Sequence, residues 1–447
     1  MFAPEFHFGC ATSAYQVEGG IENDWSRWER QGRLLDPSVR CGRAVDHWRR
    51  AEADLELLQD LGATAYRLSV EWARVEPEPG RFDQTAIDRY AFWVHRLVDR
   101  GIEPVVTFLH FTHPPWFHRL CPWHEVASQA PGRFAAFVAR MMEAFGDRVR
   151  WFTILNEPLV WLLGGTLTGM VPPGEKRFAR FAVALPTLLR GYLEARQVIR
   201  QVRPDAACGI AKNVLRFAPE RPLGSDRWLT EQVDRAYNHV IPTALTSGKI
   251  ALELPGGFEL SRPLDGGEGA LDFIGVNYYT RVYVRLDPLK RSGGSRLASF
   301  FDGRTPHGVS DLGWEIHPEG LAEALRDMSR YGLPLWVTEN GIDDRDDTRR
   351  ARFLVDHLAA VQRSIEAGVD VRGYLHWSLV DNFEWLEGFG PRFGLYRVER
   401  PSLKRAPTSA VPVYRDIIRR RSLPVLRPPA KVVSGQPKPV MPGAQPI

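Results

Sequence analysis

Residues 151–158 read WFTILNEP, and residues 335–341 read LWVTENG. Each segment is an apolar, β-type run that ends in a glutamate beside an asparagine, and the two glutamates are Glu157 and Glu339. A strand that ends in a carboxylate delivers it to the rim of a parallel sheet or barrel, where such folds collect their chemistry. Two carboxylates that face each other at about 5 Å can cleave a glycosidic bond with retention of configuration. The alternative is that each glutamate only caps the helix that follows its strand.

Around these two segments, apolar runs rich in β-branched and aromatic residues alternate with segments of helical period. This alternation predicts repeated βα units of the α/β class, and eight strands predict a closed (β/α)8 TIM barrel. The predicted strands cover residues 7–11, 65–70, 104–109, 151–155, 207–211, 273–277, 335–338 and 373–376. Between strands, residues 87–98 and 134–145 carry apolar side chains three and four positions apart, which predicts amphipathic helices that pack on the barrel.

The chain is longer than a bare barrel needs. Its 447 residues exceed the ~250 of a minimal eight-fold barrel, so we expect a single domain with extended βα loops that wall the active-site face. The best loop candidates are residues 162–179 and residues 286–312, the second being rich in Gly, Ser and Arg as in a mobile surface connection. We expect the catalytic barrel over residues 1–422 and a Pro-rich C-terminal tail over residues 423–447, since proline extends neither a helix nor a central strand.

The composition and charge of the chain argue against a nucleic acid or a membrane as its binding partner. Lys and Arg number 58 against 54 Asp and Glu, a weak excess spread along the chain, which excludes the electrostatic footprint of a nucleic-acid binder. The first residues lack a basic segment followed by an apolar stretch, and no apolar run approaches the roughly 20 residues that span a bilayer. Four cysteines lie far apart with no C-x-x-C pair, which indicates buried thiols. We therefore expect a cytoplasmic protein with no membrane partner.

Four histidines that lie close in sequence raise the question of a metal site. Pro114 and Pro115 prevent one regular helix from presenting them together, and neither an H-E-x-x-H pattern nor a cysteine partner is present. No phosphate-binding or dinucleotide-binding motif occurs either. We expect no metal and no cofactor, although a metal-dependent barrel hydrolase stays an alternative. The four histidines are His110, His113, His118 and His124.

Nine longer motifs carry a family resemblance. They are FHFGCATSAYQVEG, DHW, LGATAYRLSVEWARVEP, ILNEP, DFIGVNYYT, LGWEIHPEG, VTENG, YLHWSLVDNFEW and RFGLY, in this order along the chain. Together they resemble the family-one glycoside hydrolases, the β-glucosidase group. The resemblance implies an eight-stranded β/α barrel and a retaining exo-β-glycosidase that needs no cofactor. Its implied partner is a small-molecule β-glycoside, chiefly a β-glucoside, with β-galactosides and β-fucosides also accepted.

The same resemblance implies roles for twelve residues. Glu157 matches the acid/base and Glu339 the nucleophile. The positions that support catalysis are Arg67, Asn277 and Tyr279. The positions that bind substrate are Gln16, His110, Asn156, Trp314, Trp377, Glu384 and Trp385, with Trp314 on the aglycone side. Without the motifs, these residues could equally form a structural ion pair, a helix cap, a satisfied core histidine or aromatic core filler.

Some features depart from the family or limit the interpretation. Phe111 stands where many relatives have tryptophan, and ENDWSRWERQ replaces the usual acidic, Gly-rich segment near the N-terminus, so the aglycone loops are expected to differ. Residues 214–233 match no family segment and receive no assignment. Glu384 would repel a phosphate dianion, which favours an unphosphorylated sugar. The main alternative function is a non-catalytic carbohydrate-binding protein on the same fold. The sequence does not indicate the oligomeric state.

Overall fold

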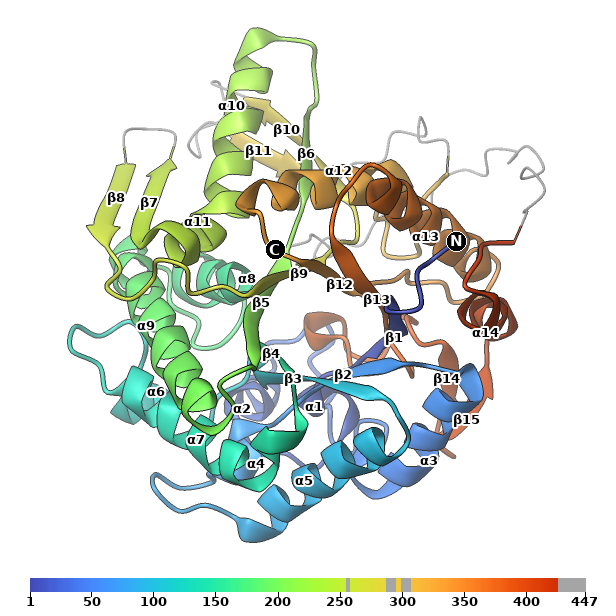
Figure 1. Ribbon diagram of the computed structural model, residues 1–447. Coiled ribbons are helices and arrows are strands. Elements are labelled where there is room, and N and C mark those ends of the chain that lie inside the picture. The colour runs from blue at the N-terminus through green and yellow to red at the C-terminus, as the bar shows by residue number, and fades with distance from the viewer. Residues whose placement is uncertain (255–257, 287–294, 299–306, 425–447) are drawn as a thin grey trace.

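Eight parallel strands close into one barrel in the computed structural model (Figure 1). The structure describes residues 1–254, 258–286, 295–298 and 307–424. The spatial order of the strands is β1-β13-β12-β9-β5-β4-β3-β2. Their bounds are β1 His7–Ala11, β2 Ala65–Ser69, β3 Glu103–Leu109, β4 Trp151–Asn156, β5 Ala207–Asn213, β9 Phe273–Asn277, β12 Leu335–Asn340 and β13 Val371–Trp377. All eight predicted strands and the predicted barrel are confirmed.

Several strands run further toward the active-site rim than the sequence pattern predicts. β5 continues to Asn213, β12 to Asn340 and β13 to Trp377. β5 pairs with β9 up to this end, where Asn213 lies opposite Asn277. Polar side chains that were expected just after a strand therefore sit within the sheet, where the register of parallel pairing fixes their direction.

The barrel interior is packed around Trp336, whose ring lies edge-on to Trp151 and stacks on His7. On the neighbouring strand, Gly373 pairs with Trp336. A Cβ atom at Gly373 would lie 2.5 Å from a carbon of the Trp336 ring. The glycine is thus required by the close approach of the indole, which fills the barrel like a core and not a pore.

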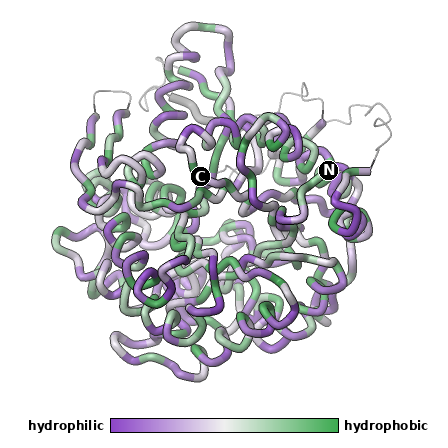
Figure 2. Tube along the Cα trace, in the orientation of Figure 1, coloured by the Kyte–Doolittle hydropathy of each residue, from purple (hydrophilic) through white to green (hydrophobic). Residues whose placement is uncertain are grey.

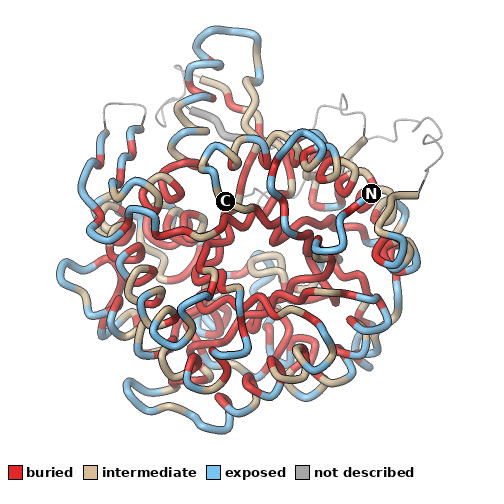
Figure 3. The backbone as a smooth tube through the Cα atoms, in the orientation of Figure 1, coloured by how far each residue is buried: buried red, intermediate tan, exposed pale blue. Residues whose placement is uncertain are grey.

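A ring of amphipathic helices surrounds the barrel. The longer helices are α3 His47–Leu61, α5 Gln84–Asp99, α7 Ala130–Phe145, α9 Phe178–Val202, α11 Val240–Ser247, α12 Pro318–Met328, α13 Arg350–Glu366 and α14 Ala410–Arg420. The two helices predicted from apolar periodicity are confirmed as α5 and α7, and they bury the faces that carry Tyr90 and Phe137. Figure 2 shows hydrophilic and hydrophobic residues alternating along these helices, and Figure 3 shows burial concentrated in the barrel strands.

Shorter elements lie in the connections. The short helices are α1 Ala14–Val17, α2 Asp24–Arg30, α4 Trp72–Val75, α6 Phe117–Leu120 and α8 Pro158–Leu162, with single turns η1 Gly146–Arg148, η2 Leu163–Thr168, η3 Arg235–His239, η4 Ser329–Tyr331 and η5 Trp385–Glu387. The longer helix α10 Gly224–Asp234 also lies in a connection. The outer strands are β6 Arg216–Pro219, β7 Lys249–Leu254, β8 Phe258–Pro263, β10 Arg281–Leu286, β11 Ser295–Ala298, β14 Tyr396–Glu399 and β15 Lys404–Pro407. The unassigned residues 214–233 form β6 and most of α10, which stand out at the top of Figure 1.

One of the two loop predictions is partly wrong, and the other lies largely outside the described residues. The prediction of a loop over residues 162–179 is wrong in its first part, because residues 163–168 continue α8 as the π-helical turn η2. Gly165 suggests a break in the sequence, yet it serves close packing, since a Cβ there would lie 2.7 Å from the carbonyl oxygen of Pro172. The predicted loop over residues 286–312 lies largely outside the described residues, apart from β11 and residues 307–312. The predicted tail lies outside them beyond residue 424.

The seam of the barrel joins the two ends of the chain. β1 pairs in parallel with β13, and α14 covers this junction. The Tyr414 hydroxyl of α14 accepts from the backbone N–H of Gly9 at 3.1 Å and lies 2.9 Å from its carbonyl oxygen. Nearby, the backbone N–H of Phe2 donates to the carbonyl of Arg421 at 2.8 Å. Among the described residues, none of the helices has the length and hydropathy needed to cross a bilayer.

Candidate active site

A single cavity of about 170 Å³ collects the predicted site residues at the carboxyl-terminal rim of the barrel. Ten of the twelve predicted residues line it directly. These ten are Gln16, His110, Asn156, Glu157, Tyr279, Trp314, Glu339, Trp377, Glu384 and Trp385. The other two, Arg67 and Asn277, contact the lining carboxylates from below. The fold therefore brings all twelve together from seven barrel strands and the loops that follow them.

Glu157 follows β4 in a left-handed backbone conformation, with φ 42° and ψ 52°. Its side chain does not cap α8 and instead accepts hydrogen bonds from Asn277 at 2.9 Å and Asn213 at 3.1 Å. Burial, together with the charge of Glu339, raises the pKa of Glu157 to about 7. A carboxyl group with such a pKa holds a proton near neutral pH, as a general acid must. The helix-cap alternative for Glu157 is wrong.

Glu339 lies within β12 and is held by two donors. Arg67, fully buried on β2, donates through Nη1 to Glu339 Oε1 at 2.5 Å. The Tyr279 hydroxyl donates to Oε2 at 2.7 Å. A carboxylate placed beside a cation and a hydroxyl donor suits nucleophilic attack, because the attacking group must be an anion. Since no helix begins directly after β12, the helix-cap alternative is wrong here too.

Asn156 links the two carboxylates through a buried amide. Its Oδ1 accepts from Arg67 Nη2 at 2.6 Å and from Asn277 Nδ2 at 3.2 Å, and its Nδ2 lies 3.2 Å from His110 Nε2. Burial and the charge of Arg67 hold the pKa of His110 well below its usual range, so the imidazole is neutral. Its Nδ1 is buried and has no hydrogen-bond partner in the part of the chain that the structure describes. The ring is therefore able to bind a hydroxyl group of a ligand.

Aromatic rings and one further carboxyl group form the rest of the inner wall. The rings of Trp377 and Trp385 both lie nearly parallel to the imidazole of His110, with centroids 6.0 and 6.1 Å away. Gln16 Nε2 donates to Glu384 Oε2 at 3.3 Å. Burial first, and then the charges of neighbouring carboxylates, raise the pKa of Glu384 to about 8. Indole faces beside polar groups of this kind match the apolar and hydroxyl surfaces of a pyranose.

The outer part of the cavity contains residues that sequence reasoning missed. Its lining is mainly apolar and comes from α8, from the residues after η2, and from the end of β5 and the residues that follow it. These residues include Val160, Trp161, Met170, Val171, Asn213 and Leu215. Asn213 had a detectable signal, because a polar residue follows the apolar core of the fifth strand just as Asn156 and Asn277 end theirs. The apolar residues lie in segments without a recognisable pattern.

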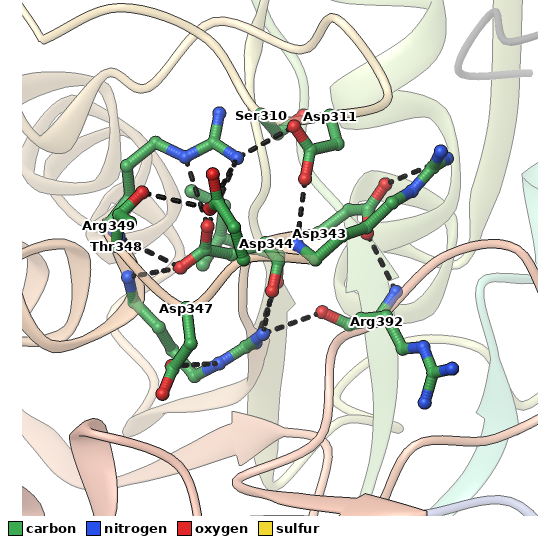
Figure 4. A network of polar contacts seen from close by, with 12 residues as sticks. Ser310, Asp311, Asp343, Asp344, Asp347, Thr348, Arg349 and Arg392 are labelled. Carbon is green, nitrogen blue, oxygen red and sulfur yellow. Dashed lines mark hydrogen bonds and ion pairs between the residues drawn. The ribbon is translucent and has the colours of Figure 1, made fainter. Parts of the chain in front are cut away.

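The loop after β12 is fixed by a polar network (Figure 4). The fully buried Asp344 accepts from the backbone N–H of Arg349 at 2.9 Å, and the Arg349 side chain bonds Asp311 at 2.7 Å. Asp343 accepts from the backbone N–H of Arg392 at 2.7 Å. The guanidinium of Arg349 lies between the carboxylates of Asp311 and Asp344, which would otherwise repel each other. This network anchors the chain directly after the strand that presents the cavity carboxylate.

The histidine cluster separates in the structure. His110 lines the cavity, whereas His113 and His118 both contact the buried Asp24, at 3.1 and 2.9 Å. Trp123 Nε1 donates to Nε2 of His113 at 2.9 Å, so His113 carries its proton on Nδ1 and donates it to Asp24. Both nitrogens of that ring are thus occupied by hydrogen bonds, which leaves no lone pair for a metal. Asp24, His113 and His118 therefore form a hydrogen-bonded structural network.

The sequence and the fold match one known family over nearly the whole chain. The family model described as Glycosyl hydrolase family 1 matches residues 1–423. The chain belongs to glycosyl hydrolase family 1. Among the relatives of this family 1 enzyme, the bifunctional beta-D-glucosidase/beta-D-fucosidase of Bifidobacterium breve is 32% identical, with 94% of this chain and 98% of the relative covered.

Solved structures agree with the family membership. The beta-glycosidase from Pyrococcus horikoshii superposes with a TM-score of 0.85 at 34% identity and covers 94% of this chain and 95% of that chain. The beta-glucosidase from Thermotoga maritima in complex with deoxynojirimycin gives a TM-score of 0.84 at 29% identity, over 95% of this chain and 99% of that chain. The family 1 membership makes the protein a glycoside hydrolase with a small-molecule glycoside as substrate, and the non-catalytic alternative is not favoured.

Proposed function

We propose that this family 1 enzyme is a retaining exo-β-glucosidase in which Glu157 is the acid/base and Glu339 the nucleophile. One observation carries the proposal: two carboxyl groups line the same cavity in opposite environments. Burial and the charge of Glu339 favour a proton on Glu157 near neutral pH, whereas Glu339 contacts a cation and a hydroxyl donor. Such a division is what double displacement requires of its two carboxyl groups.

The reaction proceeds in two steps. In the first, Glu339 attacks the anomeric carbon while Glu157 transfers its proton to the glycosidic oxygen, so the C–O bond breaks and the alcohol leaves. The product is a glycosyl ester on Glu339, whose negative charge is gone. Glu157, now a carboxylate, takes a proton from water, the water oxygen attacks the anomeric carbon, and the ester bond breaks with net retention. A sugar or alcohol that replaces water at this stage gives transglycosylation.

The inner cavity supplies the contacts for the sugar. Asn156 lies beside Glu157 and is proposed to bond the 2-hydroxyl, a contact that strengthens in the oxocarbenium-like transition state. Gln16, His110 and Glu384 offer polar groups for the remaining hydroxyls, and the indoles of Trp377 and Trp385 offer apolar faces. Two relatives named as glucosidases, one of them also a fucosidase, support β-glucosides as the main substrates and β-fucosides as further ones. We propose β-galactosides as additional substrates.

We also propose that the enzyme works in the cytoplasm. All four cysteines are buried and free, namely Cys10, Cys41, Cys121 and Cys208. Free thiols are typical of proteins in a reducing compartment.

Cleavage of aryl β-glucoside, β-galactoside, β-fucoside and β-6-phosphoglucoside side by side tests the proposal. We expect the glucoside to be cleaved with the highest or near-highest kcat/KM and the phosphorylated sugar to be rejected. Proton NMR of the first-formed sugar should show the β anomer. Appearance of the α anomer first, or the absence of cleavage of every unphosphorylated β-glycoside, would overturn the proposed mechanism.

A further inference from the structure

Lys212 is a buried cation directly behind the acid/base. It lies in β5 beside Asn213, its exposed fraction is 1%, and it does not line the cavity. Its ammonium group donates to the backbone carbonyl of Asn213 and lies 4.2 Å from the centroid of the Tyr237 ring. Among the described residues, no carboxylate forms an ion pair with it. A lysine in this state is unusual, because burying an ammonium without a close counter-ion is strongly unfavourable.

Hydrogen bonds connect Tyr237, whose ring contacts the lysine, to the carboxyl group of Glu157. The Tyr237 hydroxyl donates to Asn213 Oδ1 at 2.8 Å, and Asn213 Nδ2 donates to Glu157 Oε1 at 3.1 Å. A backbone hydrogen bond also holds Glu157 against β5, since the N–H of Glu157 donates to the carbonyl of Ala211 at 2.7 Å. Asn213 lines the cavity, so its neighbour Lys212 points to the other face of β5.

Glu157 and Lys212 each face a different set of charged groups. From the cavity side, Glu157 faces Glu339 on β12 and the carboxyl group of Glu384, and Tyr279, which follows β9, lines the same cavity. The negative charge of Glu339 favours the neutral form of Glu157. Lys212 is the cation that acts on Glu157 in the opposite direction.

Behind the barrel, Lys212 faces the charge of Asp234 on α10 and the ring of Tyr237 on η3. Burial lowers the pKa of Lys212 to about 7, and the negative charges of Glu157 and Asp234 act against that lowering. The lysine and the acid/base therefore titrate in the same range and influence each other, so their apparent pKa values belong to the pair.

We propose that Lys212 is a positioning residue for the acid/base, whose buried positive charge, held by Tyr237 and Asn213, stabilises the carboxylate that Glu157 becomes when it gives its proton to the leaving group. The inference rests on the proposed role of Glu157. Stabilising the carboxylate makes Glu157 a stronger acid in the first step. The benefit is greatest for leaving groups that need full protonation.

Replacing the charge with an isosteric neutral side chain tests this. We expect Lys212→Met to move the basic limb of the pH profile of kcat/KM upward by about one pH unit, because loss of a nearby cation favours the protonated carboxyl. At pH 5.5, kcat/KM for an alkyl β-glucoside should fall several-fold, whereas kcat/KM for a dinitrophenyl β-glucoside should stay within about twofold. The separate variant Lys212→Arg keeps the positive charge and should show the wild-type pH profile. Lys249→Met, at an exposed lysine of β7, is the matched control and should match wild type.

The outcomes separate the two proposals. An inactive wild-type enzyme refutes the proposed function, whereas an active wild type with an unmoved basic limb in a folded Lys212→Met refutes only the role of Lys212. If Lys212→Met fails to fold by circular dichroism, Tyr237→Phe decides, because it keeps the ring and removes the hydroxyl that holds Asn213. We expect Tyr237→Phe to move the basic limb in the same direction by a smaller amount, and no movement would overturn the inference.

Discussion

Arg67 on β2 and Glu339 on β12 form an ion pair across the inside of the barrel, with Nη1 and Oε1 2.5 Å apart and both side chains almost wholly buried. The same guanidinium bonds Asn156 and two threonine hydroxyls, so it joins several strands. Arg67→Met should lower the free energy of unfolding by about 3–5 kcal/mol, because it leaves a buried carboxylate without its cation. Chemical denaturation monitored by circular dichroism measures this. A variant as stable as wild type would show that the pair is not structural.

Removal of the proposed nucleophile, Glu339, should abolish turnover and allow chemical rescue. We expect Glu339→Ala to lose on the order of 10⁴-fold or more in kcat, since the covalent route is lost. Azide should attack the vacated face of the sugar and give the α-glycosyl azide, identified by NMR. Glu56→Ala, at an exposed glutamate of α3, should retain wild-type activity. Full activity in Glu339→Ala would make the nucleophile assignment wrong.

Removal of the proposed acid, Glu157, should slow the cleavage of some substrates far more than that of others. For Glu157→Gln we expect a loss of about 10²–10⁴-fold in kcat/KM with alkyl β-glucosides, and a much smaller loss with dinitrophenyl β-glucoside, which needs little protonation. A series of aryl glucosides with graded leaving-group pKa measures the dependence. Glu143→Gln, on the exposed face of α7, is the control. Equal losses for all leaving groups would contradict the acid role.

The pH dependence should follow from the raised pKa of Glu157, about 7. The free enzyme is competent only while this carboxyl is protonated, so kcat/KM should decline as pH rises through about 7. The profile is measured with phenyl β-glucoside from pH 4 to 9. A decline centred near the ordinary pKa of glutamate, about 4.3, would show that burial does not raise the pKa of this group.

The apolar outer cavity should favour apolar aglycones. We expect a higher kcat/KM for hexyl β-glucoside than for cellobiose, whose second sugar would meet few polar partners there. Met170→Glu places a charge in this lining and should raise KM for hexyl β-glucoside several-fold. Val126→Glu, at a residue 84% exposed and away from the cavity, should leave KM unchanged. A preference for cellobiose in wild type would contradict the expectation.

The fold was readable from the sequence because each barrel strand is an apolar run followed by a helical period. The twelve site residues were placed by motifs that keep their order along the chain. Lys212 and Tyr237 were beyond reach, since they lie 25 positions apart and only folding brings the ammonium over the ring. The helical turn at residues 163–168 was missed because Gly165 suggests flexibility in sequence, whereas in the structure it permits a tight backbone contact.

Closure of the barrel depends on the pairing of its first and last strands in chain order. β1 is synthesised before the other seven barrel strands, yet its partner β13 is the last of the eight to be made. Until then the nascent sheet has two open edges, which are sites for pairing with other chains. The Tyr414 hydroxyl that bonds Gly9 arrives later still. An unfinished chain therefore exposes two sheet edges until β13 has been made, and only the closed barrel brings Glu157 and Glu339 to one cavity.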